Sequence, residues 1–260
     1  MGFSTINVEL TNRCNKNCWM CGRRERENLY GDVYNKDMDF DLVKLIAKQI
    51  PFTSIVHLHN NGEGLLYPNF GDAVRTFNVQ DGITSLTTNG KLIIEKADEI
   101  IDNLDTMAIS IIQDDPEANE QLNLIHVFLA LKKDMKPFVT LRLLGNVDDK
   151  PYKKLGCLIV KRLLHSSKGS FNYERKTTIP EIGICLDFLH HLAINVNGDV
   201  SPCVRFDPNK ELILGNIKEE SLADIWYGAK RMWMFELHKT GKRNKIPFCN
   251  KCDFWGIPKG

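Results

Sequence analysis

Residues 8–24 read VELTNRCNKNCWMCGRR, and this stretch decides how the rest of the chain is interpreted. It begins inside a β-rich run, INVELT at 6–11, which predicts a strand. Cys14, Cys18 and Cys21 follow, with three residues between the first pair and two between the second. A closed thiolate metal site takes four protein ligands. The stretch therefore predicts a metal-binding loop directly after a strand, with one ligand position left open.

Short β-rich runs alternate with helical patterns through the first two thirds of the chain. The predicted strands are 6–11, 54–60, 83–89, 106–112, 138–144 and 161–167. The predicted helices are 39–50, a segment after Pro68, 91–104 and 115–133, the last with Asp115 as N-cap and Pro116 at its first position. Strands separated by such helices form a parallel sheet. We therefore predict an α/β fold, a partial (β/α)6 TIM-like barrel with its chemistry at the C-terminal ends of the strands.

The pattern changes after about residue 170. Residues 191–206 predict two strands around a turn at 197–199. Residues 221–239 predict a helix opened by Ser221, with Asp224 completing the capping pattern. These elements predict a small β-hairpin-plus-helix domain. Its boundary falls within 166–184, so the expected domains are 1–170 and 171–260.

Composition excludes several classes of function. A formal net charge of +1 gives no reason to expect a nucleic acid or an anionic membrane as partner. No apolar run approaches the ~20 residues that span a bilayer, and the N-terminal MGFSTINVEL lacks the features of a secretory signal. We therefore expect a cytoplasmic protein. Because thiols stay reduced there, the eight cysteines favour metal binding over disulfides.

Seven of the eight cysteines form two groups, the loop of three and a C-terminal set of Cys185, Cys203, Cys249 and Cys252. Four thiolates suit either a structural zinc ion or an iron–sulfur cluster, and spacing does not separate the two. Three thiolates on one loop favour a cuboidal iron–sulfur cluster with one iron open to a non-protein ligand. His57 and His59 share one face of their strand and could line the barrel. Cys157, in a helical stretch, is expected to be a small buried apolar residue.

Together these features resemble the radical S-adenosylmethionine (SAM) superfamily. CNKNCWMC matches the C-x3-C-x2-C loop of that family, in the same place after the first strand. NNGEGLLYP at 60–68 is similar to the family's Gly-Gly-Glu motif, although Asn61 replaces the first glycine. TTNG at 87–90, ISII at 109–112 and LRLLGN at 141–146 accompany the third, fourth and fifth strands in the family's order. The C-terminal cysteines resemble the twitch module, a reduced form of SPASM, and the resemblance spans nearly the whole chain.

The resemblance implies two iron–sulfur cofactors. A [4Fe–4S] cluster on the first loop would bind SAM and cleave it reductively to methionine and a 5′-deoxyadenosyl radical. An auxiliary [4Fe–4S] cluster would be held by the four C-terminal cysteines. The SAM contacts implied by matching positions are Met20, Gly62, Glu63, Gly64, Asn89, Ser110 and Arg142. Arg142 could equally bind substrate or form a structural ion pair.

The expected activity is a dehydrogenase-type oxidation of a small polar substrate such as a sugar or aminocyclitol alcohol. Hydrogen abstraction, deprotonation and electron transfer to a fully cysteine-ligated auxiliary cluster together give a two-electron oxidation. The expected partner is an external one-electron reductant such as flavodoxin or ferredoxin. One alternative is modification of a peptide, although a recognition domain has no room before the first strand. Others are an auxiliary cluster with only a structural role and a non-catalytic zinc-binding interaction module.

Several polar residues are candidates for contact with the substrate. The catalytic base stays open among His57, His59, Tyr173 and Glu174. Arg205, close to Cys203, could bind an anionic or hydroxylated group of the substrate. The charged run RRERE at 23–27 predicts a solvated loop.

Overall fold

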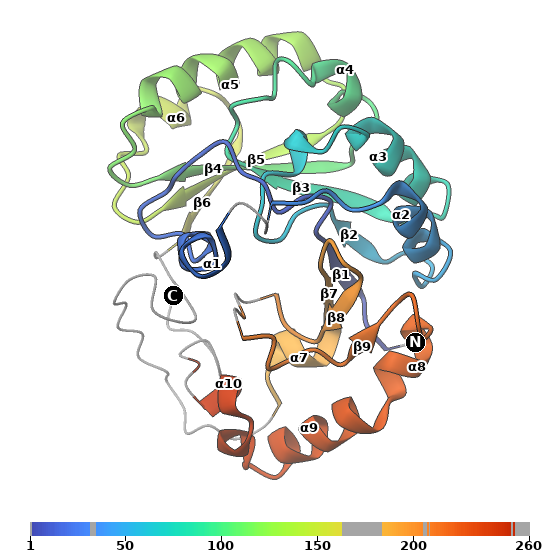
Figure 1. The fold of residues 1–260 in the computed structure, drawn as a ribbon. Coiled ribbons are helices and arrows are strands. Elements are labelled where there is room, and N and C mark those ends of the chain that lie inside the picture. The colour runs from blue at the N-terminus through green and yellow to red at the C-terminus, as the bar shows by residue number, and fades with distance from the viewer. Residues whose placement is uncertain are drawn as a thin grey trace.

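The computed structural model describes residues 2–31, 35–162, 184–204, 207, 209–250 and 252, without the side chains of 24–26. Its described strands form one sheet in the order β6-β5-β4-β3-β2-β1-β7-β8-β9 (Figure 1). The first six are β1 (Thr5–Val8), β2 (Ile55–His57), β3 (Ile83–Thr88), β4 (Thr106–Ile112), β5 (Phe138–Leu144) and β6 (Leu158–Arg162). These six are parallel and neighbour one another in chain order. The predicted partial (β/α)6 barrel is therefore confirmed.

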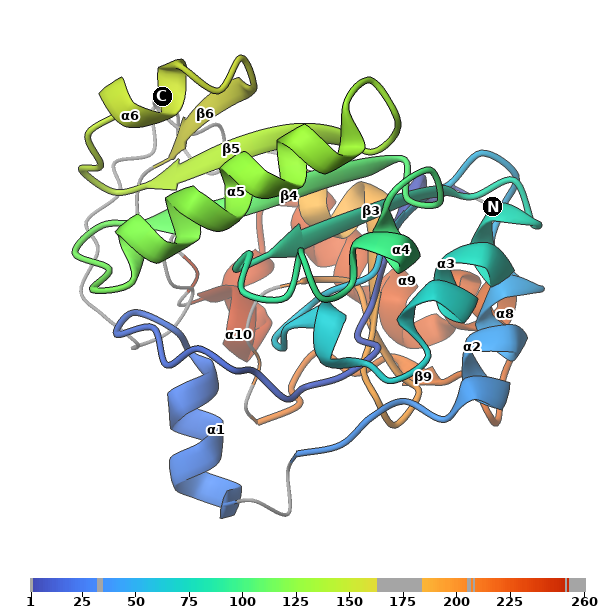
Figure 2. The same cartoon turned by 90° about the horizontal axis from the view of Figure 1, so that it is seen from above.

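Helices connect the parallel strands and cover one face of the sheet, as Figure 2 shows for α3 to α6. They are α2 (Phe40–Ala47), α3 (Phe70–Asn78), α4 (Ala97–Ile100), α5 (Ala118–Lys132) and α6 (Lys150–Lys153). Alternate strand residues point to this face, where Val56, Leu86 and Ile109 are fully buried. The intervening residues point to the opposite, inner face. The apolar core thus lies between sheet and helices, and the inner face is left to polar side chains.

The C-terminal strands extend the same sheet. They are β7 (His191–Ile194), β8 (Asp199–Ser201) and β9 (Gly215–Asn216). β7 pairs with β1 in parallel, and β8 returns antiparallel to β7 through a turn in which Gly198 has a φ of +92°. The predicted hairpin is confirmed, and its union with the barrel sheet is an additional finding. The boundary predicted at 170 lies outside the described residues.

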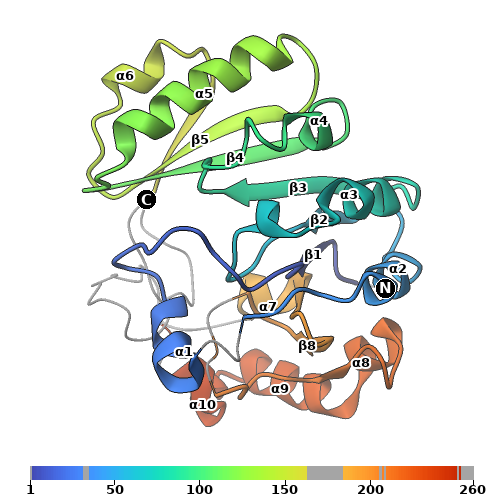
Figure 3. The same ribbon diagram turned by 45° about the horizontal axis from the view of Figure 1, so that its top comes forward.

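The C-terminal helices lie on the side of β1 away from α4 and α5 (Figure 3). They are α7 (Leu186–His190), α8 (Leu222–Tyr227), α9 (Ala229–Lys239) and α10 (Pro247–Asn250). Ser221 caps α8 as predicted, because its Oγ accepts a hydrogen bond from the Asp224 backbone N–H at 3.1 Å. The single helix predicted over 221–239 is wrong, however. The backbone of Gly228 is extended there, with a ψ of 152°, and separates α8 from α9.

Four further boundaries differ from the sequence prediction. The helix predicted from Asp115 begins at Ala118, because Asp115 caps the preceding turn by accepting from the Glu117 N–H at 3.1 Å. Of the helix predicted over 91–104, only α4 is regular α-helix. β6 begins three residues before its predicted start, so Cys157 precedes a strand and packs against the core instead of lying in a helix. The run RRERE belongs to helix α1 (Arg23–Tyr30) rather than to a loop.

No described helix is long and apolar enough to cross a membrane.

Candidate functional site

The first cysteine loop leaves the sheet where β1 ends and runs into α1. Cys14, Cys18 and Cys21 are each half-buried, and the Cys21 N–H donates to the Cys18 carbonyl at 3.1 Å. Burial raises the pKa of the Cys14 thiol, and burial together with Cys21 raises the pKa of Cys18 to about 11. Neighbouring thiols with raised pKa values ionise more readily when a metal ion binds them. The three donors therefore fit the metal cluster that the sequence predicts.

Ion pairs fix this loop against the start of α5. Lys16 is buried and forms an ion pair with Asp115, which is also buried. Lys91, after β3, pairs with Glu117 at 2.6 Å. Arg23, the first residue of α1, donates to the Lys16 carbonyl at 3.1 Å and is only 6% exposed. The cysteine loop is thus attached to β3 and to the β4–α5 connection as well as to β1.

The segment 60–64 packs directly on the backbone that leads to the cysteines. A methyl group added to Gly62 would lie 2.1 Å from the Thr11 carbonyl oxygen, and one added to Gly64 would lie 2.5 Å from the Leu58 carbonyl oxygen. The Glu63 N–H donates to the Arg13 carbonyl at 2.8 Å. Only glycine fits at these two positions. The motif thus has a packing role, while its predicted contact with the methionine group of SAM stays a prediction.

Glu63 carries a buried carboxylate that joins the motif to the end of β3. Its oxygens accept hydrogen bonds from the Thr88 hydroxyl at 2.8 Å, from the Asn89 N–H at 2.8 Å and from the Leu65 N–H at 3.2 Å. Burial raises the pKa of Glu63, and these hydrogen bonds oppose the shift. The side chain of Asn89 in turn donates to Asn15 Oδ1 at 2.8 Å and approaches Cys14 Sγ at 3.9 Å. The predicted residues Glu63 and Asn89 therefore lie at the cysteine loop.

Two other predicted SAM contacts are neighbours on the inner face. Ser110 of β4 and Arg142 of β5 stand opposite each other in the parallel register. The Ser110 carbonyl accepts from Gln121 Nε2 at 2.9 Å, and the same amide donates to the Asn89 carbonyl at 2.6 Å. Gln121 thus joins the ends of β3 and β4. Met20 is half-buried beside Cys21. The structure thus brings Asn89, Ser110 and Arg142 to one region, and the binding of SAM by these residues and Met20 stays a prediction.

A cluster of polar side chains occupies the inner face of the sheet next to Ser110 and Arg142. His57 and His59 make an edge-to-face ring contact, with centroids 5.4 Å apart. His59 Nδ1 accepts from the Thr87 N–H at 3.1 Å, and Arg142 donates to the Thr87 hydroxyl at 3.1 Å. Asn7 of β1 donates to the His59 carbonyl at 3.0 Å. The prediction that the two histidines share a face is confirmed.

Both histidines are held neutral. Burial, then His191 and Arg142, lowers the pKa of His57 to about 4. Burial, then His57 and Arg142, lowers the pKa of His59 well below its usual value. Burial is the largest cause of both shifts. Tyr173 and Glu174, the other candidate bases, and Arg205 lie outside the described residues.

The four C-terminal cysteines line one small cavity of about 30 Å³. The other lining residues are Phe188, Leu212, His238, Arg243 and Phe248. Burial and then Cys252 and Cys185 raise the pKa of Cys249 to about 12, and burial raises that of Cys185. Four half-buried thiols around an apolar cavity fit a bound iron–sulfur cluster. Sequence spacing alone left their convergence open, and their ligation of a cluster stays a prediction.

Neither cysteine group is arranged around a single ion. Within the described residues, no three His, Cys, Asp or Glu side chains converge as ligands of one metal ion. An iron–sulfur cluster binds each thiolate at a different iron, so its ligands stand further apart than those of one zinc ion.

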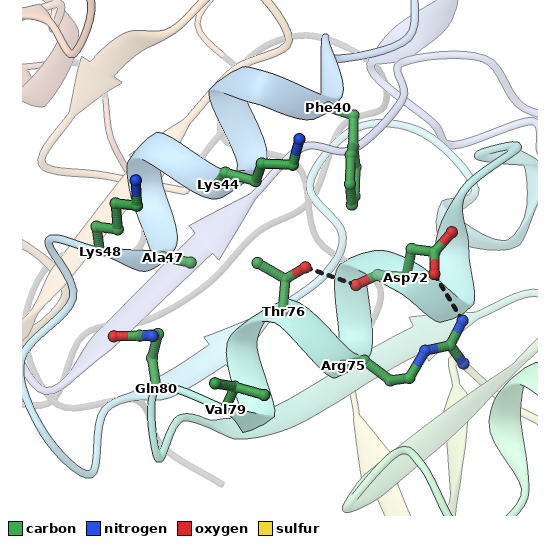
Figure 4. A pocket seen from close by; sticks show the side chains of 9 residues that line it. All are labelled: Phe40, Lys44, Ala47, Lys48, Asp72, Arg75, Thr76, Val79 and Gln80. Atoms are coloured by element: carbon green, nitrogen blue, oxygen red, sulfur yellow. Dashed lines mark hydrogen bonds and ion pairs between the residues drawn. The ribbon is translucent and has the colours of Figure 1, made fainter.

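A separate pocket of about 430 Å³ lies between α2 and α3 (Figure 4). Its polar wall includes Asp72, which accepts from Arg75 at 2.7 Å through its carboxylate and from Thr76 at 2.7 Å through its carbonyl. Both helices belong to the outer layer of the barrel. The pocket contains no cysteine and lies on the helical side, away from the inner face.

Sequence reasoning missed Glu9, which is fully buried. One carboxylate oxygen accepts from the Asn61 side chain at 2.9 Å and from its N–H at 3.2 Å, and the other accepts from the Val196 N–H at 3.3 Å. Glu9 thus links β1, the glycine motif and the C-terminal hairpin. The alternation of side chains along β1 and the residues after it could have revealed Glu9. Ile6, Val8 and Leu10 face the apolar core, so Glu9 must face the inner side of the sheet. Lys16 and Gln121 were also missed, since their partners are distant in sequence.

Two family models match the chain. The model described as the radical SAM superfamily matches residues 8–137, which is half of the chain. A second model, SPASM, described as an iron–sulfur cluster-binding domain, matches residues 185–253. The first match contains the cysteine loop and the glycine motif, and the second contains all four C-terminal cysteines.

Known proteins align with nearly the whole chain. The S-adenosyl-L-methionine-dependent 2-deoxy-scyllo-inosamine dehydrogenase of Niallia circulans is 25% identical over 96% of this chain and 93% of its own. The crystal structure of BtrN in complex with AdoMet and 2-DOIA superposes with a TM-score of 0.64 at 22% identity, over 96% of this chain and 92% of that one. Streptococcus suis SuiB bound to its precursor peptide SuiA gives a TM-score of 0.58 at 15% identity, over 98% and 70%. The chain therefore belongs to the radical SAM superfamily, as an enzyme with a SAM-binding [4Fe–4S] cluster and an auxiliary cluster in a C-terminal SPASM-type region.

Proposed function

We propose that this enzyme is a radical SAM dehydrogenase that oxidises a small polar substrate and passes an electron to its auxiliary cluster. The observation that carries the proposal is the polar inner face between the two cysteine groups. The first loop leaves the sheet at the C-terminal end of β1. Cys185 and Cys203 lie near the opposite end of the strands, where β7 begins. The inner face of β1, β2 and β7 therefore lies between the two proposed cluster sites.

The residues of the first loop would hold the SAM-binding cluster. SAM bound there supplies a 5′-deoxyadenosyl radical when one electron reaches it, and the protein positions the cofactor and excludes water. Asn89, Ser110 and Arg142 lie at the same end of the inner face, where they are proposed to bind SAM. Met20 and the segment Gly62 to Gly64 complete the proposed set.

The substrate would bind the polar cluster beneath SAM. The guanidinium of Arg142 donates hydrogen bonds, and the neutral rings of His57 and His59 can both donate and accept them. Such an arrangement suits hydroxyl groups. A pKa of about 4 makes His57 a weak base near neutral pH. We therefore assign the two histidines to holding the substrate, and the catalytic base stays open.

The auxiliary site is proposed as the electron acceptor. Its cavity has a cysteine for each iron of a [4Fe–4S] cluster, so no iron is left open for the substrate to bind. Hydrogen-atom abstraction removes one electron from the substrate. Deprotonation and transfer of a second electron to this cluster would complete the oxidation. The likeness to a dehydrogenase over nearly the full length of both chains supports this assignment.

The first test is a cofactor count. Iron, acid-labile sulfide and zinc are measured after anaerobic reconstitution of the wild type, of the Cys14/Cys18/Cys21 triple alanine variant and of Cys157→Ala. Two four-iron clusters give about eight iron per chain, and the triple variant should keep about four. Cys157→Ala is the matched control and should match the wild type. Stoichiometric zinc without sulfide at the C-terminal cysteines would refute the electron-acceptor role.

The second test is turnover. Release of 5′-deoxyadenosine is measured with a panel of aminocyclitols, sugars and short peptides, together with mass spectrometry of each substrate. Loss of two hydrogens from a polar alcohol would confirm the proposal. Turnover confined to peptides would replace it with peptide modification, the alternative that the shared fold of SuiB keeps open.

A further inference from the structure

A basic surface lies beside the auxiliary site. Residues 237–250 contain four lysines and arginines and no aspartate or glutamate. Lys239, Lys242 and Lys245 are exposed, whereas Arg243 is only 5% exposed. We call the three exposed residues the lysine face. It is cationic on a chain whose formal net charge is only +1.

The lysine face is rigidly connected to the cluster cavity. His238 and Arg243 line the cavity, and the three lysines are their neighbours in sequence. The Lys242 N–H donates to the Leu237 carbonyl at 2.7 Å, and the Lys245 N–H donates to the Lys242 carbonyl at 3.0 Å. Arg243 also donates to the carbonyl of Cys249, one of the four thiol residues. The lysine face thus belongs to the same short, hydrogen-bonded segment as two residues of the cavity wall.

Among the described residues, little negative charge compensates this face. Within the described residues, Lys242 and Lys245 form no ion pair. Lys239 pairs with Glu236 at 3.6 Å, with both side chains more than half exposed, so solvent screens this pair. Uncompensated lysines around a redox site attract a partner of opposite charge and orient its approach.

We propose that the lysine face docks an acidic one-electron carrier protein, which exchanges electrons with the auxiliary cluster. This inference rests on the proposed electron-acceptor role of that cluster. One electron crosses the interface in each encounter, no bond forms or breaks, and the carrier is oxidised or reduced as the cluster is reduced or oxidised. Three lysines give a small, compact target, which suits a transient protein encounter better than the long phosphate track of a nucleic acid.

The test follows electron transfer directly. The enzyme carrying both clusters is mixed in a stopped-flow instrument with an acidic plant-type [2Fe–2S] ferredoxin, in whichever direction is downhill. The test variant is Lys239→Glu/Lys242→Glu/Lys245→Glu. The matched control is Lys48→Glu/Lys133→Glu/Lys154→Glu, because these exposed lysines lie on the outer helical side and the charge change is equal. The Cys14/Cys18/Cys21 triple alanine variant, which keeps the auxiliary ligands, isolates that cluster.

At low ionic strength the test variant should react at least about tenfold more slowly than the wild type, and the control within about twofold. The rate of the wild type should fall with added salt, and the triple alanine enzyme should show the same charge dependence. Equal slowing in test and control variants would overturn the proposal, as would loss of the charge dependence in the triple alanine enzyme. Inhibition by a duplex oligonucleotide at concentrations below those of ferredoxin would assign the lysines to nucleic acid instead. The assay needs neither SAM nor substrate, so its failure is distinguishable from failure of the proposed oxidation.

Discussion

Replacing Gly62 with alanine tests whether the glycine motif shapes the cysteine loop. The added methyl group would lie 2.1 Å from the Thr11 carbonyl oxygen, 2.8 Å from that of Arg13 and 2.9 Å from the Asn12 Cα. All three atoms belong to backbone, so relief requires a shift of about 1 Å or more in the segment before Cys14. Overpacking of this kind costs about 1–3 kcal/mol, and a weakened Glu63–Arg13 hydrogen bond adds about 1 kcal/mol. We expect the free energy of unfolding to fall by about 2–4 kcal/mol.

The assay is urea unfolding of the reduced, iron-free chain, followed by an iron count after reconstitution. The Gly62→Ala variant should also lose iron preferentially from the first loop. Gly71→Ala is the matched control, because a methyl group there meets only side-chain atoms of Glu99 and Arg75, at 3.1 Å or more. Its stability should change by less than about 1 kcal/mol. A Gly62→Ala protein within about 0.5 kcal/mol of the wild type, with full iron, would refute the reasoning.

Three further changes probe other parts of the molecule. Lys16→Met leaves the buried carboxylate of Asp115 without its cation, so urea unfolding should show a loss of about 3 kcal/mol. The pKa of His57 is about 4 in the folded chain against 6.5 as its ordinary value, so the unfolded chain takes up a proton first as the pH falls. The wild type should therefore lose about 2 kcal/mol more than His57→Gln between pH 7 and pH 5, and equal losses would contradict the assignment. Arg243→Met removes a buried cation beside the auxiliary cysteines, and redox titration should show that cluster's potential lowered on the order of 50 mV, with Arg243→Lys in between.

The fold followed from patterns that are local in sequence. Apolar alternation and helix-length spacing identified the six parallel strands, because burial against a helical layer imposes both. Helix ends were less predictable. Asp115 caps a turn where an N-cap was expected, and Gly228 interrupts a pattern that is continuous in its apolar residues. In both places backbone geometry decides the boundary, and residue type alone does not specify it.

The residues of the site also divide into those that the sequence identified and those that it did not. The cysteines and the glycine motif were identifiable because their chemistry or their lack of a side chain restricts what can occupy the position. Glu9, Lys16 and Gln121 were not, because each acts through partners on other strands. A charged residue inside a strand becomes informative only when the neighbouring strands are known. Arg23 is the opposite case. It belongs to a charged run that was predicted to be solvated, and yet it is buried beside the cysteine loop.

The extension of the sheet by β7 has a consequence for the chemistry. β1 lies between β2 and β7, so one strand carries the first cysteine loop at its end and supports the C-terminal hairpin along its side. Four residues of strand span about 13 Å. Glu9, just after the C-terminal end of β1, bonds the glycine motif on one side and the hairpin turn on the other. The first cysteine loop and the pair Cys185 and Cys203 therefore flank opposite ends of the strands in one hydrogen-bonded sheet. In the proposed oxidation, a substrate on the inner face would lose its hydrogen near one end of these strands and pass its electron toward the other end.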